Sequence, residues 1–226
     1  VRSGATPTPA VRVALRALLI AVLLGAGYLA YRQLSDAGSG DARTLAADAT
    51  EPTLDSDRTR IDEVVLALDD LPRGWAAQAV EPAPDDICDG RVPLSVIEPL
   101  ETSRAAFTMG EAGPFITNVV STFADADEAQ AFLDLTARTI ESCRTYEVED
   151  GTSIELGPLE FPSLGDDSFA AEAVGTSPYG DLAGDFVYVR VGSRVTSVET
   201  IAFGAGESPL SPELVEHLTR LVTNRM

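Results

Sequence analysis

The sequence predicts an α+β fold: a twisted antiparallel sheet with two main helices packed on one face, preceded by one transmembrane helix. Three observations predict it. An apolar run lies near the N-terminus, strand-like segments gather in hairpins, and two capped amphipathic segments stand between and after the strands. Strands that gather in this way, without alternating with helices, indicate an α+β fold and not a parallel sheet.

The apolar run at residues 17–31 contains no charged side chain, and three arginines precede it, the last of them Arg16. Positive charges flanking an apolar segment stay in the cytoplasm, so we expect the bulk of the chain on the other side of the membrane. A spanning helix needs about 20 residues. Residues 13–32 reach this length if Arg16 extends its guanidinium to the headgroups. Residues 1–12 are then a cytoplasmic tail.

A cleaved signal peptide is the alternative for this segment, since a charged start and a run of this length suit it equally. Cleavage needs small residues two positions apart just after the run, where Tyr28 places an aromatic ring. Retention as a single-pass anchor in the cell membrane is therefore the prediction, and a buried globular helix is the least favoured reading.

Residues 33–60 are small, polar and acidic, which is typical of a flexible tether. Residues 61–226 are long enough for one extracytoplasmic domain with its own core. From residue 33 onward the chain has 36 acidic residues and 12 arginines, a net charge of −24. Such a surface repels phosphates, so nucleic acid is not an expected partner. The membrane is expected to be contacted only through the N-terminal helix.

The chain contains no lysine. P-loop enzymes and protein kinases need a lysine for the nucleotide phosphates. Schiff-base enzymes and Ser-x-x-Lys hydrolases need one as well. These classes are excluded.

The first part of the domain is predicted to form short helices and strands. Residues 61–68 favour a helix that ends near Leu71-Pro72, since proline disfavours helix at the preceding residue. A short strand is expected at 76–80 and a helical turn at 85–89. Strands at 103–109 and 115–123 flank the turn-forming residues 110–114.

A long helix is expected from Asp125 to Cys143. Asp125 can cap the free backbone donors, and Glu128 three residues later completes a capping box. The apolar face is expected at Phe132, Leu135, Thr136, Ile140 and Cys143.

Three strands are predicted after this helix, at 153–156, 169–175 and 185–191. Gly192-Ser193 turns the chain into a further strand at 194–203, which closes a hairpin. Ser211-Pro212-Glu213 has the pattern of a helix start, with a cap, a proline in the first turn and an acid. An apolar stripe over 214–222 follows it.

Cys88 and Cys143 are the only cysteines. Outside the cytoplasm such a pair predicts a disulfide. Closing a loop of about 55 residues stabilises a domain by roughly 4 kcal/mol in the chain-entropy model. A redox pair or a metal site is the alternative, but the Cys-x-x-Cys spacing and partner histidines are missing.

No catalytic, metal or cofactor site is predicted. His217 is the single histidine, and no Gly-x-Ser-x-Gly elbow supplies a nucleophile for it. The acid clusters at 85–89, 125–127 and 166–167 match no calcium loop and read as caps and turns. A carboxylate pair for glycoside hydrolysis stays open, although nothing in the sequence selects one.

A ligand cleft is the remaining hypothesis. Trp75 is the sole tryptophan. It is predicted to be a core anchor, and the alternative is that it forms an aromatic wall of a cleft. Tyr188 would be a second aromatic wall, and Arg190 a polar contact.

Several motifs recur in one order: Leu71-Pro-x-Gly74-Trp75, Cys88 near Asp89, Phe107 on a strand, a helix ending at Cys143, Gly165-Asp166-Asp167-Ser168 and Arg190-Val191-Gly192. Over about residues 66–222 the chain resembles the extracellular sensor domain of mycobacterial PknH-type kinases and related actinobacterial anchored envelope proteins. The resemblance implies a compact α+β domain outside the cell, with a cleft for an unidentified ligand. That sensor is described with two disulfides, whereas this chain can form one, and no kinase domain is present.

The expected function is therefore a membrane-anchored, extracytoplasmic, sensor-like or ligand-binding domain of the actinobacterial cell envelope, without catalysis or cofactor. Its partner would be an unknown small-molecule or envelope ligand. The alternative is a protein–protein interaction module of the envelope without a small-molecule pocket. A hydrolase is the third hypothesis.

Overall fold

The computed structural model describes residues 60–80, 86–87, 92–93, 97–110, 113–148, 151–178, 180–204 and 210–226. The predicted membrane helix, nearly all of the tether, and Cys88 lie outside these residues. Within the described part of the chain, no helix combines the length and the apolar character that a membrane span requires.

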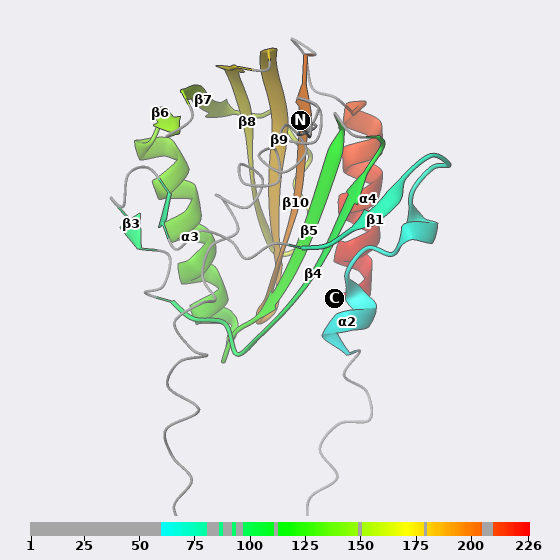
Figure 1. Ribbon diagram of the computed structural model, residues 1–226. Helices are drawn as coiled ribbons and strands as arrows, with labels where there is room; N and C mark the ends of the chain where they lie inside the picture. The colour runs from blue at the N-terminus through cyan, green and yellow to red at the C-terminus, as the bar shows by residue number, and fades with distance from the viewer. Residues whose placement is uncertain are drawn as a thin grey trace, which may run out of the picture.

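An antiparallel sheet of eight strands forms the centre of the domain (Figure 1), in the spatial order β1-β4-β5-β10-β9-β8-β7-β6. Each neighbouring pair is antiparallel, as the hairpin pattern predicts. The strands are β1 (Ala76–Gln78), β4 (Glu101–Thr108), β5 (Phe115–Thr122), β6 (Thr145–Val148), β7 (Thr152–Pro158), β8 (Asp167–Ser177), β9 (Gly180–Val191) and β10 (Arg194–Phe203).

The helices are α2 (Ile61–Val64), the 3-10 turn η2 (Leu68–Asp70), α3 (Ala126–Ser142) and α4 (Pro212–Arg225). A separate two-stranded sheet pairs β2 (Asp86–Ile87) with β3 (Val92–Pro93). The helical turn predicted at 85–89 is therefore wrong at Asp86 and Ile87, which pair with the later strand β3. Strand β6 was not predicted at all.

Both long helices begin at the predicted caps. The Asp125 carboxylate accepts hydrogen bonds from the backbone N–H groups of Asp127 and Glu128, at 3.0 and 2.9 Å. The Glu128 side chain accepts from the N–H of Ala124 at 3.2 Å, one residue earlier than an ideal capping box requires. Ser211 caps α4 through the N–H of Leu214 at 3.3 Å.

The prediction that both helices pack on one face of the sheet is wrong. Helix α3 packs against β7, β8, β9 and β10, and its core contains Phe186 and Tyr188 of β9. Helix α4 packs against β9 and β10, and its core contains Val187 and Val189. Because side chains alternate between the two faces of a strand, the helices cover opposite faces, which we call the α3 face and the α4 face (Figure 1).

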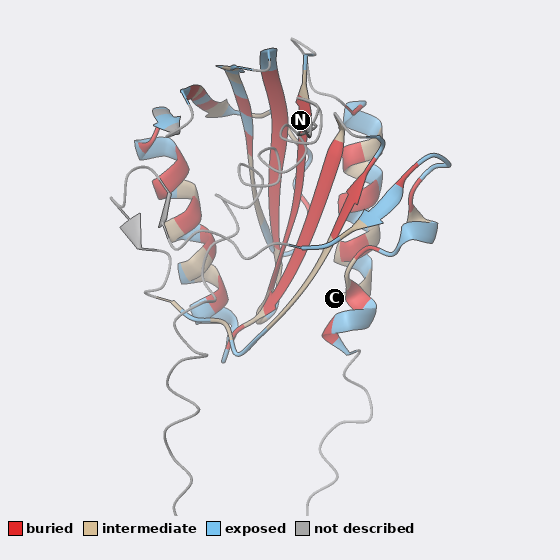
Figure 2. Cartoon of the chain, in the orientation of Figure 1, coloured by how far each residue is buried: buried red, intermediate tan, exposed pale blue. Residues whose placement is uncertain are grey.

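The physical reason lies in strand β9, whose residues are apolar at both alternating sets of positions from Phe186 to Val189. A strand of this composition buries both faces and needs a covering layer on each. Figure 2 shows the result, with buried residues along β5, β9 and β10 and on the inward sides of both helices.

Two polar contacts tie the segment before β1 to the rest of the domain. Asn118 on β5 is fully buried; its carbonyl accepts from the N–H of Leu66 at 2.9 Å, and its amide donates to the Ser197 carbonyl at 2.7 Å. Arg225 at the end of α4 makes a two-pronged ion pair with Asp70 of η2, at 2.8 and 2.7 Å. These contacts fix α2 and η2 against the α4 face.

Candidate functional site

A carboxyl group is buried in the middle of the sheet. Glu199 on β10 is 1% exposed. Its neighbour Val198 belongs to the core of the α4 face, so Glu199 points to the α3 face. In the strand register Thr117 of β5 lies on one side of it and Phe186 of β9 on the other.

Only one oxygen of this carboxyl group has hydrogen-bond partners in the described residues. The hydroxyls of Ser197 and Tyr188 both donate to Oε1, at 3.1 and 3.4 Å. Oε2 is buried and has no partner there. A buried polar atom without a partner costs about 1–3 kcal/mol, and more when it carries charge. Natural domains keep few such atoms, so this oxygen is a site where a bound group would be stabilising.

Burial raises the pKa of Glu199 from 4.5 to about 7. The hydrogen bond from Ser197, the charge of Arg104 and the hydrogen bond from Tyr188 each lower the pKa and offset part of this effect. The group therefore changes between neutral and ionised forms near neutral pH. Raised carboxyl pKa values of this kind cluster at functional sites.

Further polar side chains share the α3 face with Glu199. The register aligns Gln78, Ala106, Thr117 and Glu199 in one row across four strands. Oε1 of Gln78 is a second buried oxygen without a hydrogen-bond partner in the described residues. With strands about 4.8 Å apart, these two acceptors lie about 14 Å apart along the row.

The adjacent row adds a positive charge. Arg104 of β4 pairs with Val119, which pairs with Ser197, which pairs with Tyr188. Arg104 is half-buried, and its neighbour Ala105 packs on the α4 face, so Arg104 points to the α3 face. We call Gln78, Arg104, Thr117, Tyr188, Ser197 and Glu199 the α3-face site.

The two buried carboxyl groups of the described residues lie on opposite faces of the sheet. Asp185 is the other buried carboxylate among the described residues. It lies two residues before Val187, which belongs to the core of the α4 face, so Asp185 also points to the α4 face. The two buried carboxylates therefore do not converge, as a hydrolytic pair would require. The described residues also contain no group of three or more histidine, cysteine, aspartate or glutamate side chains that could hold a metal ion.

The structure places the three predicted cleft residues at different sites. Trp75 is buried in the core of the α4 face, so it does not share a cleft with Tyr188, which contacts Glu199 on the α3 face. Arg190 is on the α3 face, but its guanidinium is held by Gln130 of α3 at 2.7 Å and by Asp166 at 3.2 Å. Of the three predicted cleft residues, only Tyr188 belongs to the α3-face site, whereas Arg190 links α3 to β9 through its hydrogen bond to Gln130.

Two other predicted residues have clear positions. Cys143 is buried at the C-terminal cap of α3. No cysteine among the described residues is free, but Cys88 lies outside them, so the pairing of these two residues stays a prediction. His217 is exposed on α4.

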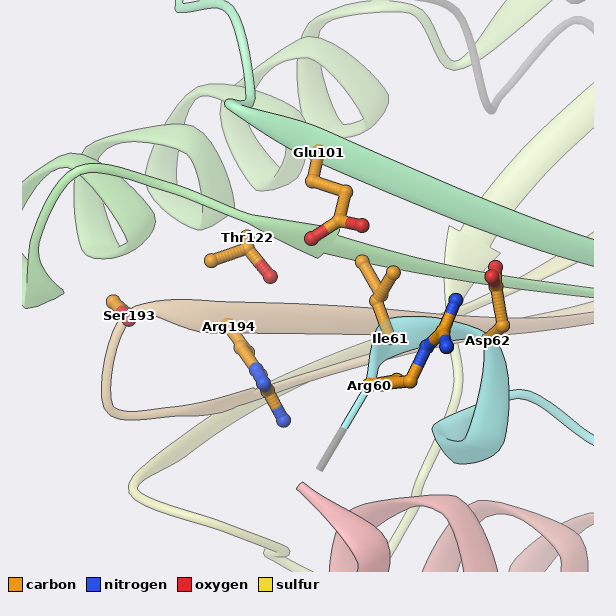
Figure 3. Close-up of a pocket in the computed structure, with 7 residues that line it drawn as sticks. All are labelled: Arg60, Ile61, Asp62, Glu101, Thr122, Ser193 and Arg194. Carbon is orange, nitrogen blue, oxygen red and sulfur yellow. The ribbon is translucent and has the colours of Figure 1, made fainter. Parts of the chain in front are cut away.

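Two hollows lie at the surface of the described residues. One, of about 220 Å³, is lined by Arg60, Ile61, Asp62, Glu101, Thr122, Ser193 and Arg194 (Figure 3). Another, of about 430 Å³, lies over the ends of β6 to β9. The charged groups around the first hollow have both signs and are largely exposed. Neither hollow is lined by a buried carboxyl oxygen without a hydrogen-bond partner.

Sequence reasoning missed Glu199, although a signal was present. Strand 194–203 has Val198 and Ile201 on either side of this acid, and it pairs with the strongly apolar β9. Glutamate is almost never fully buried without a partner. An acid in the middle of a strand that must be covered on both faces is therefore a candidate functional residue.

Comparisons with known proteins give little further information. No family model matches the chain, and no curated protein matches it. Among solved structures, the crystal structure of the extracellular domain of PknH from Mycobacterium tuberculosis is a weak structural neighbour, with 11% sequence identity and a TM-score of 0.43. The match covers 55% of this chain and 63% of that chain. Such a partial likeness transfers no residue role and no activity.

Proposed function

We propose that this chain is a membrane-anchored, extracytoplasmic, sensor-like domain that binds a small ligand on its α3 face without converting it chemically. One observation carries this proposal: Glu199 is buried at the centre of the sheet, and its Oε2 lacks a hydrogen-bond partner among the described residues. A ligand that donates to Oε2 would remove the cost of leaving it unpaired.

The surroundings of Glu199 support binding rather than hydrolysis. Two hydroxyls hold Oε1 in place, whereas the second buried carboxylate, Asp185, lies on the opposite face. A general acid needs a nucleophile or a second acid within reach of the same substrate. Sites that bind small molecules instead combine apolar walls with a few fixed polar groups.

The proposed location outside the cytoplasm rests on the sequence. The apolar run at residues 17–31 follows three arginines, which supports a location of the following domain on the other side of the membrane. A protease added to intact cells with a permeabilised wall should cut the domain. An uncut domain whose Cys88 and Cys143 react freely with alkylating reagents would refute this location.

Native mass spectrometry of the full chain, purified in mild detergent from its own envelope, tests the binding function. We expect a co-purifying small molecule on the wild-type chain and its loss in Glu199→Gln, which keeps the shape of the side chain but removes the acid. The matched control is Glu172→Gln, an exposed acid of β8, which should retain the molecule.

The same comparison can refute the proposal. A chain that carries no molecule from its envelope, or one that carries the same molecule in Glu199→Gln, would show that the α3-face site is not where a ligand binds. Circular dichroism of both variants confirms that the fold is intact before the comparison is made.

A further inference from the structure

The α3-face site also indicates the chemical class of its ligand, an inference that rests on the proposed function. We propose that the ligand is an organic cation, a primary or quaternary amine whose single positively charged head lies against Oε2 of Glu199. Four features support this class.

The orientation of the carboxyl group is the first feature. Ser197 and Tyr188 donate to Oε1 and hold it as an acceptor, so Oε2, which is buried without a partner among the described residues, is the oxygen that a ligand would contact. Hydroxyl donors on one oxygen favour the ionised carboxylate. A carboxylate oxygen that is buried and unpaired is best matched by a group that carries a positive charge.

The second feature is aromatic. Phe186 lies directly across from Glu199 in the β9–β10 register and is almost completely buried. Side chains of such cross-strand pairs have Cβ atoms about 5 Å apart. Tyr188 is the next aromatic along the same face, and its ring centre is 6.4 Å from that of Phe169. Aromatic rings next to a carboxylate are the usual surroundings of an ammonium head.

The third feature is the small number of oxygen ligands. Calcium takes six to eight oxygens and magnesium six, whereas one carboxylate oxygen is unpaired here and the described residues hold no cluster of metal-binding groups. A donor set of one unpaired oxygen and aromatic neighbours suits an organic cation better than a hard metal ion.

The charge of the domain is the fourth feature. A net charge of −24 after residue 32 raises the local concentration of cations and speeds their encounter. Arg104 contributes the opposing charge on the α3 face, where it lowers the pKa of Glu199. Its presence disfavours a second positive charge on the ligand, so the class is a monocation.

Calorimetric titration of the full chain in detergent tests this class with three probes: choline, butylamine, and 3,3-dimethyl-1-butanol, the neutral isostere of choline. We expect choline or butylamine to bind at least tenfold more tightly than the neutral isostere. In Glu199→Gln this preference should disappear, whereas Glu172→Gln should keep it. The comparison of choline with its isostere on the wild-type chain needs no variant.

The pH dependence provides a second readout. A cation binds the ionised carboxylate, so affinity should fall as Glu199 becomes protonated. With a pKa of about 7 for this group, the expected loss of affinity between pH 8 and pH 5 is roughly 100-fold. Affinity that does not change over this interval would overturn the inference.

The possible failures are distinguishable. If the neutral isostere binds as tightly as choline, or if the co-purifying molecule that depends on Glu199 is uncharged, the cation class is wrong and the binding function stands. If no probe binds and no molecule depends on Glu199, both the class and the proposed function are wrong.

Discussion

Replacing Glu199 with glutamine should make the domain more stable above neutral pH. The wild-type carboxyl group has a pKa of about 7 when folded and 4.5 as the ordinary value. The folded state therefore holds the proton more tightly than the unfolded state. Stability is highest when the group is protonated in both states, falls as pH rises from about 4.5 to 7, and is constant above that interval.

The magnitude follows from the same two values. Each pKa unit corresponds to about 1.4 kcal/mol, so ionised Glu199 lowers the free energy of unfolding by about 3 kcal/mol above pH 7. Between pH 5 and pH 8 the loss is about 2.5 kcal/mol. The glutamine introduced by Glu199→Gln cannot ionise, so the variant should be close to wild type at pH 5 and more stable by about 3 kcal/mol at pH 8.

Urea unfolding of wild type, Glu199→Gln and Glu172→Gln at pH 5, 6, 7 and 8 measures this difference. Other titrating groups cancel because only the difference between chains is used. The exposed control should follow wild type within about 0.5 kcal/mol at each pH. Parallel pH profiles for wild type and Glu199→Gln would refute the reasoning, since they would mean that Glu199 titrates alike in the folded and unfolded states.

Three other predictions concern contacts that stabilise the fold. Asp70→Asn should lower the free energy of unfolding by about 1–3 kcal/mol at pH 7, since it breaks the two-pronged pair with Arg225. The hydrogen bond from Arg225 lowers the pKa of Asp70. Urea unfolding should therefore show the stabilisation by this pair disappearing as pH falls below about 3.8. Asn118→Ala should lower the urea midpoint by the equivalent of about 2–4 kcal/mol, because it leaves the buried N–H of Leu66 and the Ser197 carbonyl of β10 without their partner. A loss below about 0.5 kcal/mol would contradict this. Reduction of the predicted Cys88–Cys143 bridge should lower stability by roughly 4 kcal/mol, and unchanged thermal unfolding after reduction would argue against the bridge.

The sequence allowed the elements with local signals to be predicted. Asp125 and Ser211 both cap helices as expected, because a cap needs only a few consecutive residues. The hairpin of β9 and β10 was also predicted, from Gly192-Ser193 at its turn. In the structure Gly192 adopts a φ of +57°, a conformation that glycine adopts readily.

Features that depend on distant contacts could not be predicted in the same way. The buried residues of α3 include Leu133, not the flanking Phe132 or Leu135, which are half-buried. The sequence of α3 has an apolar period, but which of its side chains are fully buried depends on how the helix packs against β7 and β8. The pairing of β2 with β3 likewise depends on a partner strand and overrides the helical pattern at Asp86.

The functional site shows the same limit. Tyr188 was selected as an aromatic wall of a cleft and does lie beside Glu199, but the sequence alone did not show that Trp75 points to the opposite face. Glu199 became a candidate only when the register placed it between Thr117 and Phe186. Its significance arises from burial, which a local pattern does not report.

The most direct test of the account is a carbon-13 NMR titration of the Glu199 carboxyl group in the full chain, assigned with the Glu199→Gln variant. We expect a midpoint near pH 7 without ligand, in line with the pKa that burial produces. After incubation with the low-molecular-weight fraction of the envelope, the midpoint should move to lower pH as a donor reaches Oε2. A midpoint near 4.5 without ligand, or one that no envelope molecule moves, would contradict the claim that this carboxyl group is a ligand-binding site.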